Sequence, residues 1–487
     1  MSRVESTDSI ESSQVVTLQP VRIPQGQQLD LALLHQLNPQ RYPFLLESVA
    51  KSELGSYDIL FAFPQQTLQL VDPAKAGDFV QAAKQQLAES NWPLVDCDLP
   101  FFGGWFAYFS YDYAQVVEPT LNLPKSEFPL ANLTRVPCAI VVNHKTAEIT
   151  IVAENEFSAQ IAEIEQDIQA ALKLPKLGGS LTQNVQTQQA CEEPDQKYLS
   201  GIETIKEYIL AGDIFQVNLS RLWQVELSPQ DHYLTVYEAL RQNNPAPFAA
   251  LVHFSDKQDT EHNVPAWQII SSSPERLVKY KFPWVDTRPI AGTRKRSDDL
   301  EQDRALIEEL ISHPKERAEH IMLIDLERND LGRICQPGTV EVNELMVVES
   351  YEHVHHIVSN VRGQLRAGFD SLDVVHALFP GGTITGCPKV RCMEIIAELE
   401  QMPREAYTGS LGYINRDGSM DLNILIRTMI HNQTDDKNLI QFRAGAGIVA
   451  DSQADSELVE THHKAKGLIN ALNGSSQSKR QTTQGDK

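Results

Sequence analysis

The stretch Ser410-Leu-Gly-Tyr-Ile-Asn-Arg-Asp-Gly-Ser-Met-Asp-Leu-Asn-Ile-Leu-Ile-Arg-Thr-Met-Ile430 decides the fold class, because it reads as two antiparallel strands around a tight turn. The first strand is predicted from Ser410 to Asn415 and the second from Met420 to Ile430. The turn at Arg416-Asp-Gly exploits the tolerance of glycine for positive φ. A third antiparallel strand is predicted from Leu439 to Val449. The C-terminal half of the chain is therefore expected to contain antiparallel sheet.

Strands and helices alternate irregularly in the rest of the chain. A hairpin is predicted where Cys138-Ala-Ile-Val-Val and Ile149-Thr-Ile-Val flank a polar turn. Helical spacing predicts helices over 157–172, over Tyr198–Leu210 with an end at Gly212, and over 299–326 with an interruption near Pro314. Because no regular β-α alternation appears, we expect an α+β fold rather than a doubly wound parallel sheet.

Composition shifts divide the chain into five predicted parts. Residues 1–20 and 473–487 are polar and are expected to be disordered. Residues 21–173 form an N-terminal region, and residues 174–195, rich in Gly, Ser, Thr and Gln, are the predicted linker. The densest motifs follow it, so a catalytic domain is predicted over 196–472.

The charge balance excludes several classes of partner. The 487 residues include 42 Lys and Arg against 65 Asp and Glu, which gives a formal net charge of −23. Nucleic acid and anionic membranes require a basic face, so neither is an expected partner. Six scattered cysteines show no zinc-like spacing, and no apolar run reaches membrane-spanning length. We expect reduced thiols and a cytoplasmic protein.

A glycine-rich loop precedes a predicted helix in Pro380-Gly-Gly-Thr-Ile-Thr-Gly-Cys-Pro-Lys-Val-Arg391. Pro388 suits the first turn of a helix, and a helix N-terminus offers unpaired N–H groups beside Lys389 and Arg391. This arrangement has the form of an anion cradle. A plain loop-to-helix connection explains the same pattern, and both interpretations stay open.

Two pairs of carboxylates share helix faces. Glu316 and Glu319 lie three residues apart, as do Glu457 and Glu460. Oxygen ligands of this kind suit Mg²⁺, which is usually held by one or two carboxylates together with substrate and water. Most acidic pairs on helices are simply solvated, which is the alternative.

Other polar groups are placed within apolar surroundings. Arg427 is predicted to lie in mid-strand, where a buried guanidinium needs a carboxylate from the protein or from a ligand. His353 and His355 should share one strand face and His356 the other, which favours a single acid or hydrogen-bond donor over a zinc site. The charged run Asp325–Arg333 is expected to form salt bridges and caps.

These segments occur in one order with further motifs, and the series resembles the chorismate-utilising enzyme family. The motifs are Pro289-Ile-Ala-Gly-Thr293, Ile324-Asp-Leu-Glu-Arg-Asn-Asp-Leu-Gly-Arg333, His356-Ile-Val-Ser, the loop Gly381–Arg391, Ile426-Arg-Thr and Ala444-Gly-Ala-Gly447. The resemblance covers about residues 200–470 strongly. It implies an α/β sandwich in which two antiparallel sheets pack between helical layers.

The resemblance also implies a set of site residues. It identifies Glu319 and Glu460, with Glu457 close by, as ligands of Mg²⁺, which stabilises developing negative charge. Tyr407 and Arg427 are similar to residues that contact a chorismate carboxylate, together with backbone around Gly445 and Gly447. The same pocket is lined in the family by residues that match Gly292, Thr293, Thr383 and Lys389, and His356 matches a histidine beside the ring and the leaving group. The resemblance places His356, Thr293 and Lys389 in catalytic positions.

The product expected from the resemblance is 4-amino-4-deoxychorismate. Gln216-Val-Asn-Leu, Ala246-Pro-Phe-Ala-Ala, Gly381-Gly-Thr-Ile-Thr-Gly and Gly409-Ser-Leu-Gly-Tyr413 resemble aminodeoxychorismate synthase component I. Ala291 is instead typical of anthranilate synthases, because many other members carry a lysine there and a methyl group cannot act as nucleophile or base. Anthranilate synthase is therefore the alternative, and a non-catalytic chorismate-binding homologue is the competing interpretation from another class.

Two further expectations concern regulation and ammonia. Leu45-Leu-Glu-Ser48 resembles the family's tryptophan-binding segment, although a strand end packed on the core explains it equally well. The chain has no recognisable amidotransferase module. The resemblance therefore implies a separate glutamine amidotransferase subunit as the source of ammonia.

Overall fold

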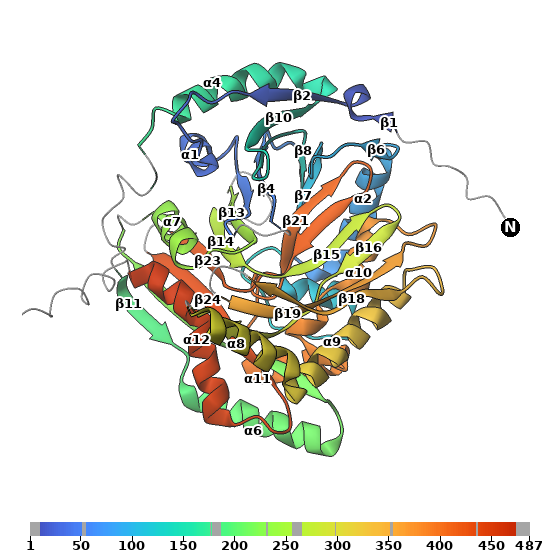
Figure 1. Cartoon of the computed structure of the whole chain (residues 1–487), viewed down its shortest axis with the longest axis vertical. Coiled ribbons are helices and arrows are strands. Elements are labelled where there is room, and N and C mark those ends of the chain that lie inside the picture. Colours follow the sequence, from blue (N-terminus) through green and yellow to red (C-terminus); the bar gives the residue numbers. More distant parts are fainter. Residues whose placement is uncertain are drawn as a thin grey trace, which may run out of the picture.

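Two large antiparallel sheets face each other and carry helices on their outer sides (Figure 1). The computed structural model describes residues 10–50, 55–175, 177, 187–229, 232–255, 265–297, 299–350, 354–434 and 437–473. Every pairing within the two large sheets is antiparallel, and helices are numerous. The predicted α+β class with two antiparallel sheets between helical layers is confirmed.

The larger sheet has twelve strands in the described residues. Their order is β11 (Thr187–Glu192), β12 (Gln216–Leu227), β24 (Asn438–Ile448), β23 (Thr428–Gln433), β14 (Trp267–Ser273), β13 (Phe248–Phe254), β3 (Phe44–Glu47), β4 (Tyr57–Ala62), β9 (Cys138–Asn143), β10 (Glu148–Glu154) and β2 (Val16–Val21), with β20 (Gly386–Cys387) paired to β12.

The smaller sheet has ten strands in the same ranges. Their order is β17 (Ile290–Lys295), β19 (Val354–Gln364), β16 (Trp284–Thr287), β15 (Arg276–Lys281), β22 (Met420–Asn423), β21 (Ser410–Asn415), β7 (Gly104–Phe109), β8 (Ala131–Val136) and β5 (Thr67–Leu70), with β18 (Glu341–Ser350) paired to β19. A separate parallel pair joins β1 (Ile10–Glu11) to β6 (Val95–Asp96).

Helices cover the outer faces. On the larger sheet lie α1 (Leu31–Leu37), α4 (Ile161–Ala171), α7 (Tyr233–Asn243) and α12 (Ala454–Asn473), and the red α12 runs beside α7 and β24 in Figure 1. The second outer core contains α2 (Ala76–Glu89), α3 (Ala114–Val117), α6 (Asp195–Ala211), α9 (Pro314–Gly332), α10 (Ser371–Leu378) and α11 (Lys389–Glu400). The remaining helix α8 (Leu300–Ser312) contacts β17. No helix in the described ranges is long and apolar enough to cross a membrane.

Burial on both faces explains the continuous apolar strands. In β7, Trp105 and Phe109 join the outer core, whereas Phe106 and Tyr108 point into the space between the sheets. There Phe106 stacks on Phe44 with ring centroids 4.0 Å apart. Side chains alternate between the two faces of a strand, so a strand with two covered faces is apolar throughout.

Several predicted elements are confirmed. The hairpin is β9 and β10, which pair antiparallel. The helix predicted over 157–172 is α4, preceded by a 3-10 helix over Asn155–Gln160. The next predicted helix is α6, which ends at Gly212 with φ of 83°. The interruption near Pro314 separates α8 from α9.

Other expectations need correction. Residues 10–21 contain β1 and β2, so the predicted disorder up to residue 20 is wrong for this part, while residues 1–9 and 474–487 lie outside the described residues. The predicted linker includes β11, which pairs with β12. The N-terminal region, residues 21–173, supplies strands to both sheets. Its apolar strand faces are therefore buried together with those of the strands that follow the predicted linker.

The strand predicted from Met420 to Ile430 is also wrong in its middle. It is two strands, β22 in the smaller sheet and β23 in the larger one, separated by residues 424–427. Its apolar sequence concealed the break, because the connection begins with Ile424 and Leu425, which are buried like strand residues.

Candidate functional site

The candidate site lies where two strand pairs pass from one sheet to the other. β14 continues into β15, and β22 continues into β23, so each pair changes sheet at the same level. The two connections are hydrogen-bonded to each other: Ser272 N–H donates to the Arg427 carbonyl (3.1 Å), and Ile424 N–H donates to the Glu275 carbonyl (3.0 Å). This exchange brings Glu275 and Arg427 to the point where the sheets diverge.

Arg427 occupies this connection with positive φ (52°), not the mid-strand position predicted for it. Burial lowers the pKa of its guanidinium. Its Nη1 donates to Asn244 Oδ1 across 3.5 Å, and no carboxylate pairs with it among the described residues. A partly buried cation in this state has lost some of its hydration without gaining a counter-ion, which is unfavourable unless a ligand supplies the anion.

His356 lies next to Arg427 and contacts both predicted pocket residues of β17. Its Nδ1 is 2.9 Å from Thr293 Oγ1 and 3.4 Å from the Gly292 carbonyl oxygen. Burial, followed by the charge of Arg427, lowers the pKa of His356 to about 4. The imidazole is therefore neutral near pH 7, which suits a hydrogen-bonding group better than an acid.

Gly292 has φ of 70° in a bulge of β17. A Cβ at this position would lie 2.8 Å from Glu316 Oε2, so the Glu316 side chain covers the glycine. Glu316 also pairs with Arg294 at 3.2 Å. Within the predicted Glu316–Glu319 pair, the Glu316 carboxylate therefore already has its contacts on β17.

The glycine-rich loop adds a second side to the site. Its 3-10 turn (Gly382–Ile384) carries Thr383, and its short strand β20 pairs with Gln216 and Val217 of β12. Lys389 follows the loop, but its Nζ is engaged by Asp330 (2.5 Å) and by the Leu378 carbonyl (3.4 Å). The ammonium of Lys389 therefore links the residues before and after the loop to each other and to α9.

Glycines of β24 form a third side. Gly445 lies opposite Ser220 and Gly447 opposite Asn218 of β12. A Cβ at Gly445 would lie 2.4 Å from the Leu219 carbonyl oxygen. One at Gly447 would lie 2.4 Å from Gln216 Nε2, so both positions require the close approach that glycine permits. Tyr407, which is buried, stands in the loop before β21.

Unpartnered buried polar atoms gather around these three sides. Three of the residues that carry these atoms adjoin predicted site residues: Gln216 adjoins Gly447, Asn218 adjoins Gly445, and Asn244 adjoins Arg427. Buried polar atoms are normally hydrogen-bonded, so a group of exceptions marks a place where a polar ligand completes them. The atoms without a partner among the described residues are Gln216 Oε1, Asn218 Oδ1, Asn244 Nδ2, Glu275 Oε1 and Thr383 Oγ1.

Glu275 and Lys464 were not predicted as site residues. Burial raises the pKa of Glu275 to about 7, and nearby Thr383 and Lys464 oppose the shift. Lys464 donates to the Gly445 carbonyl (2.9 Å) and pairs with Glu460 (2.8 Å). Two sequence features could have indicated them. Glu275 is a carboxylate at the end of an apolar strand, and Lys464 lies on the same helix face as Glu457 and Glu460.

The predicted metal ligands come from two helices. Glu319 lies half-buried on α9, whereas Glu457 is 8% exposed and Glu460 is half-exposed on α12. The three do not form a compact group. The one described set of three close ligand atoms is Glu192, Asp195 and His462. The buried Arg221 guanidinium pairs with both acids of that set, so it already has its cation.

Hard carboxylate oxygens from two helices, without a closed protein cage, fit Mg²⁺. This ion commonly retains water and accepts substrate oxygens beside one or two carboxylates. The donor set of Glu319, Glu457 and Glu460 is therefore chemically suitable, and a substrate oxygen or water would complete it.

The other predicted polar groups have structural partners. His355 contacts Asp303 (2.9 Å) and Ser350 (2.7 Å) on the face of β19 opposite to His356, while His353 lies outside the described residues. Within the run Asp325–Arg333, Asp325 pairs with Arg328 and Asp330 with Lys389. The expectation of salt bridges in this run is confirmed.

Ser48 lines a separate cavity between the two sheets. Ser48 Oγ donates to the Pro247 carbonyl (3.1 Å), and its N–H donates to Asp58 Oδ1 (2.8 Å). The cavity has a volume of about 90 Å³. Its walls come from β3, β4 and β13 on one side and β21 and β22 on the other, with Glu47, Ser48, Tyr57, Pro247, Leu411, Tyr413, Asp421 and Asn423 among the lining residues.

Comparison with known proteins identifies the family. The chorismate binding enzyme family matches residues 42–470. An anthranilate synthase component I-like protein of Synechocystis is 41% identical over 386 residues, covering 77% of this chain and 74% of the relative. Aminodeoxychorismate synthase component 1 of Bacillus subtilis is 40% identical over 408 residues and covers 82% of each chain. The structure of anthranilate synthase component I from Streptococcus pneumoniae is similar with a TM-score of 0.71 at 30% identity, covering 92% of this chain and 99% of that one. The chain belongs to the chorismate binding enzyme family.

Proposed function

We propose that the chain aminates chorismate with ammonia in a Mg²⁺-dependent reaction, and that the product is 4-amino-4-deoxychorismate. The observation that carries this proposal is the partly buried Arg427, which has no carboxylate partner in the described residues and lies near buried polar atoms that also lack a partner there. A ring acid with two carboxylates supplies the missing anion and the missing hydrogen-bond partners.

In this proposal Arg427 and the Tyr407 hydroxyl bind one carboxylate of chorismate. The backbone around Gly445 and Gly447 accepts close approach because neither residue has a Cβ. Gln216, Asn218 and Thr383 complete the polar wall. These groups orient the ring and exclude water from it.

Glu319, Glu457 and Glu460 would hold Mg²⁺ at the other end of the substrate. When bound, the ion supplies positive charge that neutralises a substrate carboxylate and stabilises negative charge that develops on it.

Glu275 is proposed as the acid that assists departure of the ring hydroxyl. Ammonia forms a C–N bond as the C–O bond breaks, and the hydroxyl takes the Glu275 proton and leaves as water. The resulting carboxylate accepts a proton from the new ammonium group, which restores the acid. A pKa of about 7 permits both directions of transfer near neutral pH. Neutral His356 donates or accepts a hydrogen bond beside the leaving group.

Anthranilate is the second candidate product, and Ala291 favours it. This residue lies on β17 immediately before Gly292 and offers only a methyl group. Without a protein nucleophile, one displacement at ring carbon 2 with loss of the 4-hydroxyl gives a 2-amino adduct, from which loss of pyruvate gives anthranilate. The four sequence segments and the Bacillus subtilis relative support the 4-amino product.

A separate glutamine amidotransferase subunit is proposed as the source of ammonia. The cavity at Ser48 is proposed to bind tryptophan, because apolar side chains such as Leu411 and Tyr413 line it beside Ser48. Ligand pockets commonly combine such an apolar lining with a few polar groups that orient the ligand.

The test is direct turnover. The purified chain is incubated with chorismate, Mg²⁺ and ammonium at mildly alkaline pH, and the products are separated chromatographically. A product that yields 4-aminobenzoate only after addition of a lyase supports the proposal, whereas fluorescent anthranilate selects the second candidate. Absence of turnover contradicts both and favours a binding function.

A further inference from the structure

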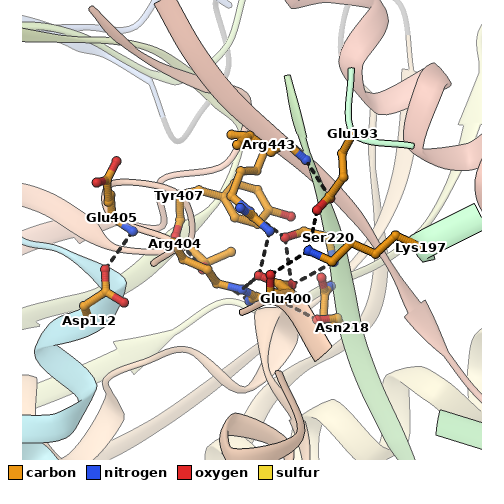
Figure 2. A network of polar contacts seen from close by, with 12 residues as sticks. Asp112, Glu193, Lys197, Asn218, Ser220, Glu400, Arg404, Glu405, Tyr407 and Arg443 are labelled. Atoms are coloured by element: carbon orange, nitrogen blue, oxygen red, sulfur yellow. Dashed lines mark hydrogen bonds and ion pairs between the residues drawn. The ribbon is translucent and has the colours of Figure 1, made fainter. Parts of the chain in front are cut away.

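A fully buried ionic cluster connects the segments that form the proposed chorismate site. Its centre is Glu400, the last residue of α11, whose carboxylate lies between Arg404, Arg443 and Ser220 (Figure 2). Arg404 donates to it through Nε (3.0 Å) and Nη2 (2.6 Å), and Arg443 donates through Nη2 (2.9 Å). The Ser220 N–H (2.9 Å) and hydroxyl (2.8 Å) also donate to it.

The cluster reaches three segments at positions adjacent to proposed substrate contacts. Arg404 Nη1 donates to the Ile384 carbonyl (3.2 Å), and Ile384 follows Thr383 in the glycine-rich loop. Arg404 Nη2 donates to the Asn218 carbonyl (2.6 Å). Ser220 and Asn218 lie directly opposite Gly445 and Gly447.

The third segment carries Tyr407. The Arg404 guanidinium lies 5.6 Å from the centroid of the Tyr407 ring and 4.8 Å from that of Tyr111, so it packs between two aromatic side chains. The rigid planar fork of arginine makes all these contacts at once, which a lysine ammonium on a flexible stem cannot do.

Stability alone is a weak explanation for this arrangement. A buried ion cluster loses its hydration, and well-packed apolar residues of equal volume are commonly as stable or more stable. Such a cluster does fix geometry, because each contact has a defined direction.

We propose that Glu400, Arg404 and Arg443 are positioning residues that hold the glycine-rich loop, the β12–β24 backbone and Tyr407 in register for chorismate binding. None of the three touches the substrate. This inference rests on the proposed function of the same site.

The test compares two Arg→Lys variants of the full chain. Arg404→Lys keeps the charge but removes the fork. Arg135→Lys is the matched control, because Arg135 also bonds one carboxylate, Glu154, and two backbone carbonyls, those of Gly104 (3.0 Å) and Val136 (3.1 Å), within another part of the fold. Melting temperature, kcat and KM for chorismate, and the calorimetric Kd of chorismate are measured for both.

We expect Arg404→Lys to raise KM and Kd roughly tenfold or more, since several charge-assisted contacts are lost together. Arg135→Lys should lower the melting temperature without changing either constant. An unchanged Kd in Arg404→Lys overturns the inference, as does an equal change in both variants. If Arg404→Lys does not fold, Ser220→Ala takes its place, because it removes only the hydroxyl that bridges Arg443 and Glu400. A wild-type chain that neither turns over nor binds chorismate refutes the proposed function itself.

Discussion

Replacing Arg427 by glutamine separates stability from function in a way that the structure specifies. Arg427 is partly buried, and within the described residues its one side-chain hydrogen bond is the 3.5 Å contact with Asn244. Removing the charge therefore ends a desolvation cost and breaks no ion pair. Arg427→Gln is expected to melt at the wild-type temperature or above it, while chorismate binding weakens.

The loss of affinity follows from the contact that is removed. Hydrogen bonds to a charged group contribute about 1.5–3 kcal/mol, which corresponds to roughly 10- to 150-fold in Kd. Titration calorimetry with chorismate measures Kd, and differential scanning calorimetry of the free protein measures the melting temperature.

Arg276→Gln is the matched control. Arg276 is also buried, but it forms a bidentate pair with Asp421 at 2.8 and 3.0 Å. Breaking this pair is expected to cost about 3–5 kcal/mol of stability with little effect on the Kd of the folded protein. A lower melting temperature for Arg427→Gln together with an unchanged chorismate Kd would refute the reasoning, because Arg427 would then be a structural residue.

Three other variants test the remaining parts of the site. Glu275→Gln should lower kcat by about 100-fold or more with a small change in KM, as expected when a general acid is removed. At a constant concentration of NH₃, wild-type kcat should fall as pH rises through about 7, because Glu275 then loses its proton. A flat profile of kcat from pH 6 to 8 would exclude Glu275 as the acid. Glu460→Ala should abolish the Mg²⁺-dependent turnover and leave the melting temperature nearly unchanged, since the ion pair of Glu460 with Lys464 is exposed. A wild-type Mg²⁺ titration curve would remove Glu460 from the metal site. L-tryptophan should raise the melting temperature of the wild type but not of Ser48→Phe, whose ring fills the cavity; the same shift in both proteins would place tryptophan elsewhere.

Antiparallel strands and amphipathic helices were predictable because their signals are local. The β9–β10 hairpin follows from two apolar runs around a polar turn, and the end of α6 follows from the left-handed Gly212. Such features depend on a few neighbouring residues, so a single sequence contains them.

The exchange of strands between sheets was not predictable in this way. Residues 424–427 continue an apolar run, and only the pairing of β22 with β15 and of β23 with β14 reveals the break. Arg427 was predicted as a buried cation in mid-strand, but it is partly buried, and its position at the crossing depends on contacts far apart in sequence.

The dependence on distant contacts also explains why the surroundings of Glu275 and Lys389 could not be predicted from the sequence. A glutamate after an apolar strand is an ordinary pattern, and its raised pKa results from burial among segments that sequence analysis treats separately. Lys389 was predicted in a catalytic position beside the glycine-rich loop, whereas its Nζ pairs with Asp330 of α9. Local sequence indicates which residues are unusual, whereas tertiary pairing decides which of them remain free to bind a ligand.

The central claim is that one pocket at the sheet crossing holds a doubly charged ring acid. A crystal structure of the chain with chorismate and Mg²⁺ tests it most directly. We predict one substrate carboxylate on the Arg427 guanidinium, backbone of Gly445 and Gly447 against the ligand, and the cation between α9 and α12. Chorismate bound elsewhere, with Arg427 still lacking an anionic partner, would contradict the account.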